Sequence, residues 1–288
     1  MMRSFILYRM LLVMVLLQMG CSVFTGDKGY FIIHQQVSKD SAVLLKNSIN
    51  GSVSNDVFQP LVYKEAGNSS LPYRMLAPET LSGKQRYPLV LVLHGSGAVG
   101  TDNVAQLGIL AKLWAQPGIR AKYPAYVVAP QFPQRSSSYV MDKNLGVLVS
   151  SPGACLTTAL QLVDSLKKAL PVDERKIYVV GFSMGASSVI NAVSMRPGLF
   201  AAGVAVSGIP SFTQLDNLKN TPLWIVHGNA DTENPMASDS LLHQQLHAKH
   251  ADHQLKYWEV VNLDHSIYNE LYSGDALPKW LFKHGRKR

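Results

Sequence analysis

The chain has 288 residues, enough for one large α/β domain or two small ones, and its hydrophobic content of 47% is ordinary for a globular protein. It has a formal net charge of +8 and two cysteines, Cys21 and Cys155, so a disulfide framework is excluded. The positive charge concentrates at the C-terminal end, where we expect a solvated terminus or, alternatively, contact with an anionic lipid or cell-wall polymer. No nucleic-acid-binding signature accompanies it, and we expect no nucleic-acid partner.

The first 21 residues form a separate unit. Arg3 and Arg9 precede an apolar run over residues 10–17, and a small residue lies directly before Cys21, which is the layout of an export signal. The ending Leu-Gln-Met-Gly-Cys resembles a bacterial lipoprotein signal. We therefore expect an exported protein, either a periplasmic or cell-envelope lipoprotein attached to the membrane through lipidated Cys21, or a secreted protein. An uncleaved N-terminal anchor is the third alternative.

Residues 22–57 are the least informative part of the chain, and we interpret them as a tether or as extra strands. Residues 30–33 and 42–45 are strand-like, and the polar residues after them predict a turn. Residues 58–63 and 71–77 are two further strand-like runs, which predict an antiparallel hairpin at one edge of a sheet.

Residues 87–93 are apolar throughout, as in a strand buried on both faces, and they open into a glycine-rich loop at residues 94–100. The spacing of this loop fits neither a P-loop nor a dinucleotide fingerprint. It favours an oxyanion loop, in which the backbone N–H of Ser96 faces a bound carbonyl oxygen. We expect His94 to support this loop through hydrogen bonds.

The middle of the chain continues the alternation of helices and strands. Residues 103–115 predict a helix, and residues 125–130 predict the next strand. Residues 131–153 are rich in Ser, Gly and Pro and predict a long loop, which is our candidate substrate wall; a plain surface excursion is the alternative. Residues 156–170 predict an amphipathic helix, and Cys155 at its start fits a small buried side chain.

The most informative stretch is residues 176–185, Lys-Ile-Tyr-Val-Val-Gly-Phe-Ser-Met-Gly. A buried strand runs into a G-x-S-x-G turn, and a helix follows. A serine hydroxyl is a poor nucleophile unless a base can reach it, so Ser183 must stand clear of the backbone on a tight turn that favours glycine on both sides. The turn also aims the Met184 backbone N–H at the reacting carbonyl oxygen. A chance G-x-S-x-G is the alternative, and the flanking strand and helix argue against it.

Three strand-like stretches, residues 203–208, 223–228 and 256–260, predict the remaining strands. Because strands and helices alternate with short connections, we expect an α/β fold whose mostly parallel central sheet has helices on both faces. Asp231 follows the second of these strands and His265 the third. In this arrangement His265 would take the hydroxyl proton of Ser183 and return it to the leaving group, while Asp231 fixes the imidazole tautomer.

Three other carboxylates compete with Asp231 for the position beside His265. Asp264 is adjacent to the histidine, but neighbours in a tight loop point in different directions. Glu233 and Asp239 lie further beyond the strand end. We therefore expect Asp231 to orient the imidazole.

A histidine cluster follows, and its spacing of i and i+4 would suit zinc on a helical face. Its members are His243, His247, His250 and His253. The carboxylate of the usual zinc motif is not nearby, and a solvated helix face is a simpler interpretation. We expect no metal and no cofactor.

Several of these stretches together resemble the predicted-peptidase and esterase branch of the α/β-hydrolase superfamily. They are residues 87–97, 129–131, 181–185, 227–231, 264–266 and 278–282. The resemblance covers about residues 58–284 and extends to dienelactone hydrolase-like, feruloyl esterase-like and prolyl oligopeptidase-type domains. It implies a hydrolase domain over residues 58–288, a serine nucleophile with the triad named above, and no cofactor. Relatives often have an acidic residue in the oxyanion loop where Ala98 or Val99 stands here.

The expected function is that of an exported serine hydrolase that cleaves a small-molecule carboxylic ester through an acyl-enzyme. Cleavage of a peptide or amide is the alternative on the same fold, since both reactions use the same three side chains. A non-catalytic, surface-tethered binding protein is the alternative from another class. A protein that only binds has no need of three groups placed for proton transfer, which argues against that alternative.

Overall fold

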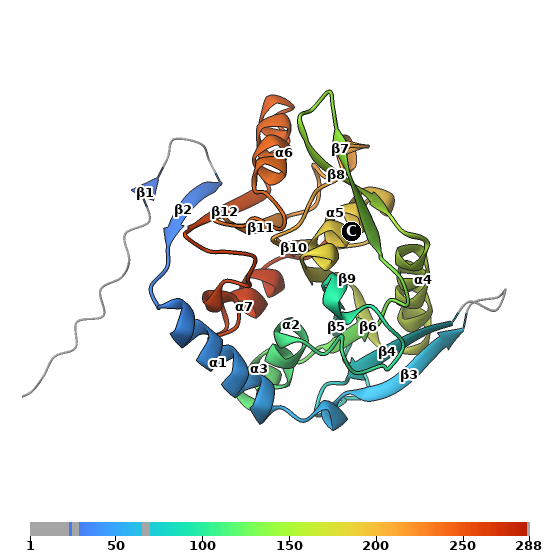
Figure 1. The fold of residues 1–288 in the computed structure, drawn as a ribbon. Coiled ribbons are helices and arrows are strands. Elements are labelled where there is room, and N and C mark those ends of the chain that lie inside the picture. The colour runs from blue at the N-terminus through green and yellow to red at the C-terminus, as the bar shows by residue number, and fades with distance from the viewer. Residues whose placement is uncertain (1–22, 25–28, 65–69, 287–288) are drawn as a thin grey trace, which may run out of the picture.

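The computed structural model describes residues 23–24, 29–64 and 70–286. The predicted export signal over residues 1–21 lies outside these residues. The described residues form an α/β fold (Figure 1). Its large sheet contains β1 (Val23–Phe24), β2 (Tyr30–His34), β3 (Gln59–Lys64), β4 (Ser70–Leu76), β5 (Tyr87–Leu93), β6 (Tyr126–Pro130), β9 (Val172–Phe182), β10 (Ala202–Val206), β11 (Leu223–Gly228) and β12 (Leu255–Val261). The helices are α1 (Lys39–Ser52), α2 (Ile109–Lys112), α3 (Pro117–Lys122), α4 (Ala154–Ala169), α5 (Met184–Met195), α6 (Ala237–Ala248) and α7 (Ala276–Phe282).

The order of strands in the sheet is β1-β2-β12-β11-β10-β9-β5-β6-β4-β3. All neighbours from β2 to β6 run parallel, whereas β1, β4 and β3 run antiparallel to the strands beside them. The predicted mostly parallel sheet is therefore confirmed, and so is the antiparallel hairpin, β3 and β4, at one edge.

Two apolar layers, one on each face, hold the sheet between helices. Successive side chains of a strand point to opposite faces, and β5 shows this alternation: Leu89 and Leu91 belong to the core cluster that includes α4, α5 and α6, while Val90 and Val92 belong to the cluster that includes α1, α2 and α7. Both faces are buried, which explains why this strand is apolar at every position.

Two predicted elements of the N-terminal half were wrong. Residues 42–45 lie in α1 instead of a strand, because the Ser38 hydroxyl caps this helix by accepting the backbone N–H of Ser41. The predicted helix over residues 103–115 begins only at α2. Asp102 accepts two backbone N–H groups in a tight turn, and Asn103 takes a positive φ of 55°, so the chain cannot be helical there.

The predicted long loop over residues 131–153 contains a separate hairpin of two strands, β7 (Ser137–Asp142) and β8 (Val147–Pro152). Hydroxyl groups fasten the hairpin to α5: Ser137 Oγ lies 2.9 Å from Ser188 Oγ, and the Asn191 side chain donates to Ser150 Oγ at 3.2 Å. The serines of this segment are therefore part of the interface between the hairpin and α5. The predicted loop was wrong in that much of it forms strands.

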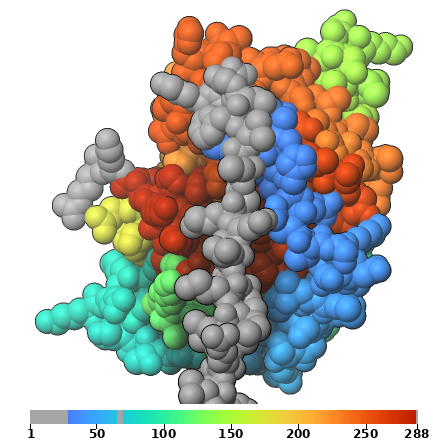
Figure 2. Space-filling model, turned by 90° about the vertical axis from the view of Figure 1, so that its left-hand side faces the viewer, coloured from blue at the N-terminus to red at the C-terminus, as the bar shows by residue number. Residues whose placement is uncertain are grey.

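The ends of the described chain join the sheet and its covering layer. Residues 30–34 form a strand as predicted, and they pair in parallel with residues 257–261 of β12, so that N-terminal and C-terminal segments lie side by side (Figure 2). At the other end, the Phe282 ring of α7 stacks on Trp114 and Tyr178, which ties the basic C-terminal segment to the core. Among the described helices, none has the length and hydropathy needed to cross a bilayer.

Candidate active site

Ser183 occupies a strained turn between β9 and α5, with φ 56° and ψ −121°. The turn brings α5 so close to the sheet that side chains are excluded on both sides of the serine. A Cβ at Gly181 would lie 2.3 Å from Gly185 O, and a Cβ at Gly185 would lie 2.1 Å from Leu93 O. The two glycines are therefore required by close backbone approach, and the serine is left at the mouth of the helix.

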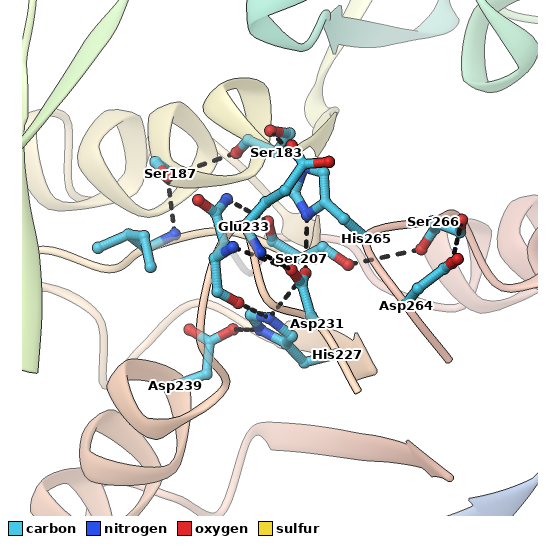
Figure 3. A network of polar contacts seen from close by, with 12 residues as sticks. Ser183, Ser187, Ser207, His227, Asp231, Glu233, Asp239, Asp264, His265 and Ser266 are labelled. Carbon is cyan, nitrogen blue, oxygen red and sulfur yellow. Dashed lines mark hydrogen bonds and ion pairs between the residues drawn. The ribbon is translucent and has the colours of Figure 1, made fainter. Parts of the chain in front are cut away.

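Ser183, His265 and Asp231 form a hydrogen-bonded chain (Figure 3). His265 Nδ1 lies 2.7 Å from Asp231 Oδ2, and His265 Nε2 lies 2.8 Å from Ser183 Oγ. An ionised carboxylate can only accept, so Nδ1 of the neutral imidazole carries the proton and Nε2 accepts the serine hydroxyl. This tautomer leaves the basic nitrogen directed at the hydroxyl.

Asp231 is completely buried as a side chain, and four donors surround its carboxylate. Oδ1 accepts the backbone N–H groups of Glu233 and Asn234, each at 2.9 Å, while Oδ2 faces His265 and, at 3.3 Å, His227 Nε2. Burial alone would raise the pKa of Asp231, but the hydrogen bonds from His227 and His265 and from the Asn234 backbone bring it well below the usual value. The carboxylate is therefore ionised and fixed in orientation.

A second buried pair lies behind Asp231 and was not predicted. His227 Nε2 donates to Asn234 O at 2.8 Å, and His227 Nδ1 lies 2.7 Å from Asp239 Oδ2 on α6. Burial opposes the charged imidazole, but hydrogen bonds with Asp231 and Asp239 raise the pKa of His227 to about 9. Burial also raises the pKa of Asp239. The network thus extends from Ser183 through two aspartates and two histidines (Figure 3).

The competing carboxylates lie elsewhere. Asp264 forms an ion pair with Lys39 of α1 and accepts the Ser266 hydroxyl at 2.5 Å, so it turns away from its neighbour His265. Glu233 is 73% exposed, and its carboxylate lies 3.7 Å from His265 Nε2, on the side of the imidazole that faces the serine. Only Asp231 reaches Nδ1 among the described carboxylates.

The glycine-rich loop after β5 approaches the nucleophile. A Cβ at Gly95 would lie 3.5 Å from Ser183 Cβ, and Ser96 begins a single 3-10 turn. His94 Nε2 accepts the Phe132 backbone N–H at 2.9 Å, so its proton is on Nδ1, which donates to Gly95 O at 2.7 Å. Burial lowers the pKa of His94, and the neutral ring fastens the loop, as expected.

The backbone N–H groups of Ser96 and Met184 remain the predicted donors to a bound oxyanion. Met184 is the first residue of α5, where a helix leaves its N–H groups without internal acceptors. Such donors stabilise negative charge without having to reorganise during the reaction.

The histidines considered for zinc lie on α6 and just beyond it. His247 Nδ1 lies 2.6 Å from Asp252 Oδ2, and the ring of His243 packs on those of Tyr30 and Tyr257. Within the described part of the chain, no three His, Cys, Asp or Glu side chains are grouped as a metal site would require.

Cys155, which we expected to be a small buried side chain, is buried in the first turn of α4. Burial raises the pKa of its thiol to about 11, so the thiol stays protonated at neutral pH. It fills space in the core, as its sequence context indicated.

We expect the double variant His227→Gln/Asp239→Asn to alter the pH dependence of unfolding. A histidine whose pKa rises from 6.5 to about 9 on folding stabilises the fold fully below pH 6.5, and this contribution is lost as the pH rises through about 9. The difference in free energy of unfolding between wild type and variant should therefore shrink by up to about 3 kcal/mol over this interval.

Urea unfolding of both proteins across the same pH series measures this difference. Titrating groups that contact neither His227 nor Asp239 are common to both proteins, so their contributions cancel. Asp231, whose pKa depends on its hydrogen bond with His227, titrates far below this pH interval. A difference that stays constant or grows with pH would contradict a charged His227.

Comparison with known proteins adds a family to this geometry. The model of the dienelactone hydrolase family matches residues 81–275. A stretch of 71 residues is 32% identical to the bifunctional acetylxylan esterase/xylanase XynS20E of Neocallimastix patriciarum. This stretch covers 25% of this chain and 11% of that protein.

Two solved structures show the same fold. A thermostable esterase superposes with a TM-score of 0.71 at 27% identity, over 81% of this chain and 64% of the esterase. The ferulic acid esterase AmCE1/Fae1A of Anaeromyces mucronatus superposes with a TM-score of 0.52 at 14% identity, over 74% of this chain and 85% of that one. The match thus spans less than two thirds of the acetylxylan esterase/xylanase and of the thermostable esterase. Since the family model covers more than half of its residues, the chain belongs to the dienelactone hydrolase family and has the α/β-hydrolase fold.

Proposed function

We propose that this protein is a serine hydrolase that cleaves carboxylic esters through an acyl-enzyme. One observation carries the proposal: a serine hydroxyl on a strained turn lies 2.8 Å from an imidazole nitrogen whose other nitrogen is held by a buried carboxylate. Membership of a hydrolase family and the likeness to esterase structures support it.

In the acylation step, Ser183 Oγ attacks the ester carbonyl carbon while His265 Nε2 takes the hydroxyl proton. The carbonyl oxygen becomes an oxyanion, which the backbone N–H groups of Ser96 and Met184 stabilise. The ionised Asp231 stabilises the imidazolium that forms. Collapse of the tetrahedral intermediate breaks the bond to the alkoxy oxygen, and His265 returns the proton to that oxygen.

In the second step, water replaces the alcohol. His265 takes a proton from the water, the resulting hydroxide attacks the acyl carbon, and the bond to Ser183 Oγ breaks as the proton returns to the serine. The products are one carboxylic acid and one alcohol for each ester and water consumed. This cycle needs only the side chains and N–H groups named above.

Cleavage of amides is the second candidate, because the same side chains can protonate an amine leaving group. The likeness to Pyrococcus horikoshii acylaminoacyl peptidase, with a TM-score of 0.54 at 13% identity, shows the shared fold alone. The thermostable esterase is 27% identical to this chain, a higher identity than that of the peptidase, and we therefore favour ester cleavage.

Replacing the nucleophile tests the proposal. Ser183→Ala should lower kcat for p-nitrophenyl butyrate by about 10⁶-fold, because the triad acts as a unit. Ser138→Ala, which removes an exposed hydroxyl on β7, is the matched control and should keep the wild-type rate. A fluorophosphonate probe should label wild type but not Ser183→Ala. Folded wild-type protein that takes no label would instead favour a binding protein.

The choice of carboxylate can be tested separately. Asp231→Asn should lower kcat by about 10⁴-fold, because the amide favours the wrong imidazole tautomer. Glu233→Gln removes the exposed carboxylate 3.7 Å from His265 Nε2 and should change kcat by no more than about threefold. Steady-state hydrolysis of p-nitrophenyl butyrate measures both variants. An equal loss in the two would remove Asp231 from its assigned role.

We also propose that the protein is exported and carries lipid on Cys21, from the charge and hydropathy pattern of residues 1–21. Metabolic labelling with a fatty-acid analogue should mark wild type and the control Cys155→Ser, and should miss Cys21→Ser. Label that persists in Cys21→Ser would exclude lipidation at this residue.

A further inference from the structure

A cavity of about 220 Å³ opens against the glycine-rich loop and Phe182, the residue before Ser183; Ser183 itself does not line it. Its walls come from the loop after β5, from the start of α2, and from the residues next to the serine and the histidine. The lining includes Gly95, Gly108, Ile109, Leu110, Phe182 and Ile267. Gly95 ties it to the reacting centre, because a Cβ there would lie 3.5 Å from Ser183 Cβ and 3.4 Å from Phe182 Cδ1.

The walls offer mainly apolar surface, with the Phe182 ring beside aliphatic side chains. None of the described lining residues carries a formal charge. His94 uses both ring nitrogens within the protein, and the Gln106 amide nitrogen donates to Asn103 Oδ1 at 2.6 Å. Gln106 Oε1 has no partner, but it is fully buried and is not presented to a ligand. The cavity therefore suits an apolar group without a hydrogen-bonding end.

The size of the cavity sets the length of that group. A water molecule occupies about 30 Å³ in the liquid, and a methylene is of similar size, so 220 Å³ holds roughly seven such groups. An acetyl group would leave most of this space unfilled. A hydroxycinnamoyl group would place its phenolic hydroxyl among aliphatic side chains, at the cost of an unpaired polar group.

The position of the cavity decides which part of an ester it receives. The leaving oxygen must lie next to His265 Nε2, which protonates it, and the exposed carboxylate of Glu233 lies on that side. The alcohol therefore points toward Glu233. The acyl chain leaves the carbonyl carbon along the oxyanion loop, where Gly95 and Phe182 begin the cavity. Ile267 and the Phe182 ring, whose centroid lies 5.0 Å from that of the His265 ring, form the wall nearest the imidazole.

We propose that this cavity is the acyl-binding site for medium-chain aliphatic esters, with an optimum near six to eight acyl carbons, as its volume of roughly seven methylene-sized groups suggests. The inference rests on the proposed function, since it assumes an acyl-enzyme at Ser183. The chain would stay in the cavity through both steps, while the alcohol leaves and water enters from the side of His265. Selectivity would then reside in the loop before α2, outside the hydrogen-bonded chain of Ser183, His265 and Asp231.

Gly108 offers a direct test. It lines the cavity at an exposed position, its backbone is ordinary with φ −79°, and a Cβ there would meet no atom within 4 Å, so a larger side chain fits without strain. Each buried methylene is worth up to about fourfold in kcat/KM, so wild type should prefer p-nitrophenyl hexanoate to the acetate by at least about tenfold. Gly108→Leu adds a bulky side chain at the exposed wall of the cavity, where it obstructs a long acyl chain, and should abolish most of this preference.

Two further variants complete the test. Gly118→Leu is the matched control, because Gly118 of α3 is exposed, also has free space around its Cβ position and does not line the cavity; it should keep the wild-type preference. Ile267→Ala enlarges the cavity and should move the optimum to longer acyl chains, which keeps the proposal testable if Gly108→Leu fails to fold. Thermal unfolding and fluorophosphonate labelling report folding and an intact nucleophile.

The outcomes separate the two proposals. If hydrolysis depends on Ser183 but the hexanoate preference is absent, or survives Gly108→Leu, the cavity is not the acyl site. Faster turnover of methyl hydroxycinnamates than of methyl hexanoate would also overturn the inference, as would an effect of Gly108→Leu on a series of alkyl acetates instead of the acyl series. Hydrolysis that is unchanged in Ser183→Ala would overturn the proposed function itself.

Discussion

The structure depends on the close approach of α5 to the carboxyl end of β9 and β5. Ser183 keeps a positive φ only because the surrounding backbone determines it: its N–H donates to Val206 O at 2.9 Å, and its carbonyl accepts the Ser187 N–H at 3.1 Å. The glycines at 181 and 185 remove the side chains that would prevent this contact. The strained backbone conformation of Ser183 holds its hydroxyl clear of the backbone and directs it at His265. The energetic cost of this conformation is thus linked to the hydrogen bond between the two side chains.

A buried carboxylate imposes the second requirement. Taking Asp231 out of water is unfavourable unless its oxygens are fully hydrogen-bonded, and here two backbone N–H groups and two imidazoles meet that need. His227 would itself be a costly buried cation, and Asp239 balances it. Asp231, beside His265, is therefore the first member of a buried charge network that fixes α6 against the end of β11.

The local sequence pattern was sufficient to predict those elements whose residues are dictated by a single strand or turn. The apolar run of β5 and the glycine spacing around Ser183 predicted a strand buried on both faces and a serine turn, because packing on both sides dictates every position. Contacts between distant segments were not predictable in this way. Asp239 pairs with His227 across twelve residues because of where α6 lies, and Ser137 of β7, a strand paired with β8, finds its hydroxyl partner on α5, 51 residues away.

The residues proposed for the reaction and the residues proposed for acyl selectivity lie in different parts of the fold. Ser183, Asp231 and His265, the proposed proton-transfer groups, sit at the ends of β9, β11 and β12, where the sheet fixes their separations and leaves little freedom for change. The cavity wall at residues 105–111 belongs to a connection whose turn is set by Asp102 and whose helix starts at a glycine. Substitutions there can alter the shape of the cavity without touching the hydrogen bonds among Ser183, His265 and Asp231. A protein with this division can keep one reaction while its preferred acyl group changes with a few side chains.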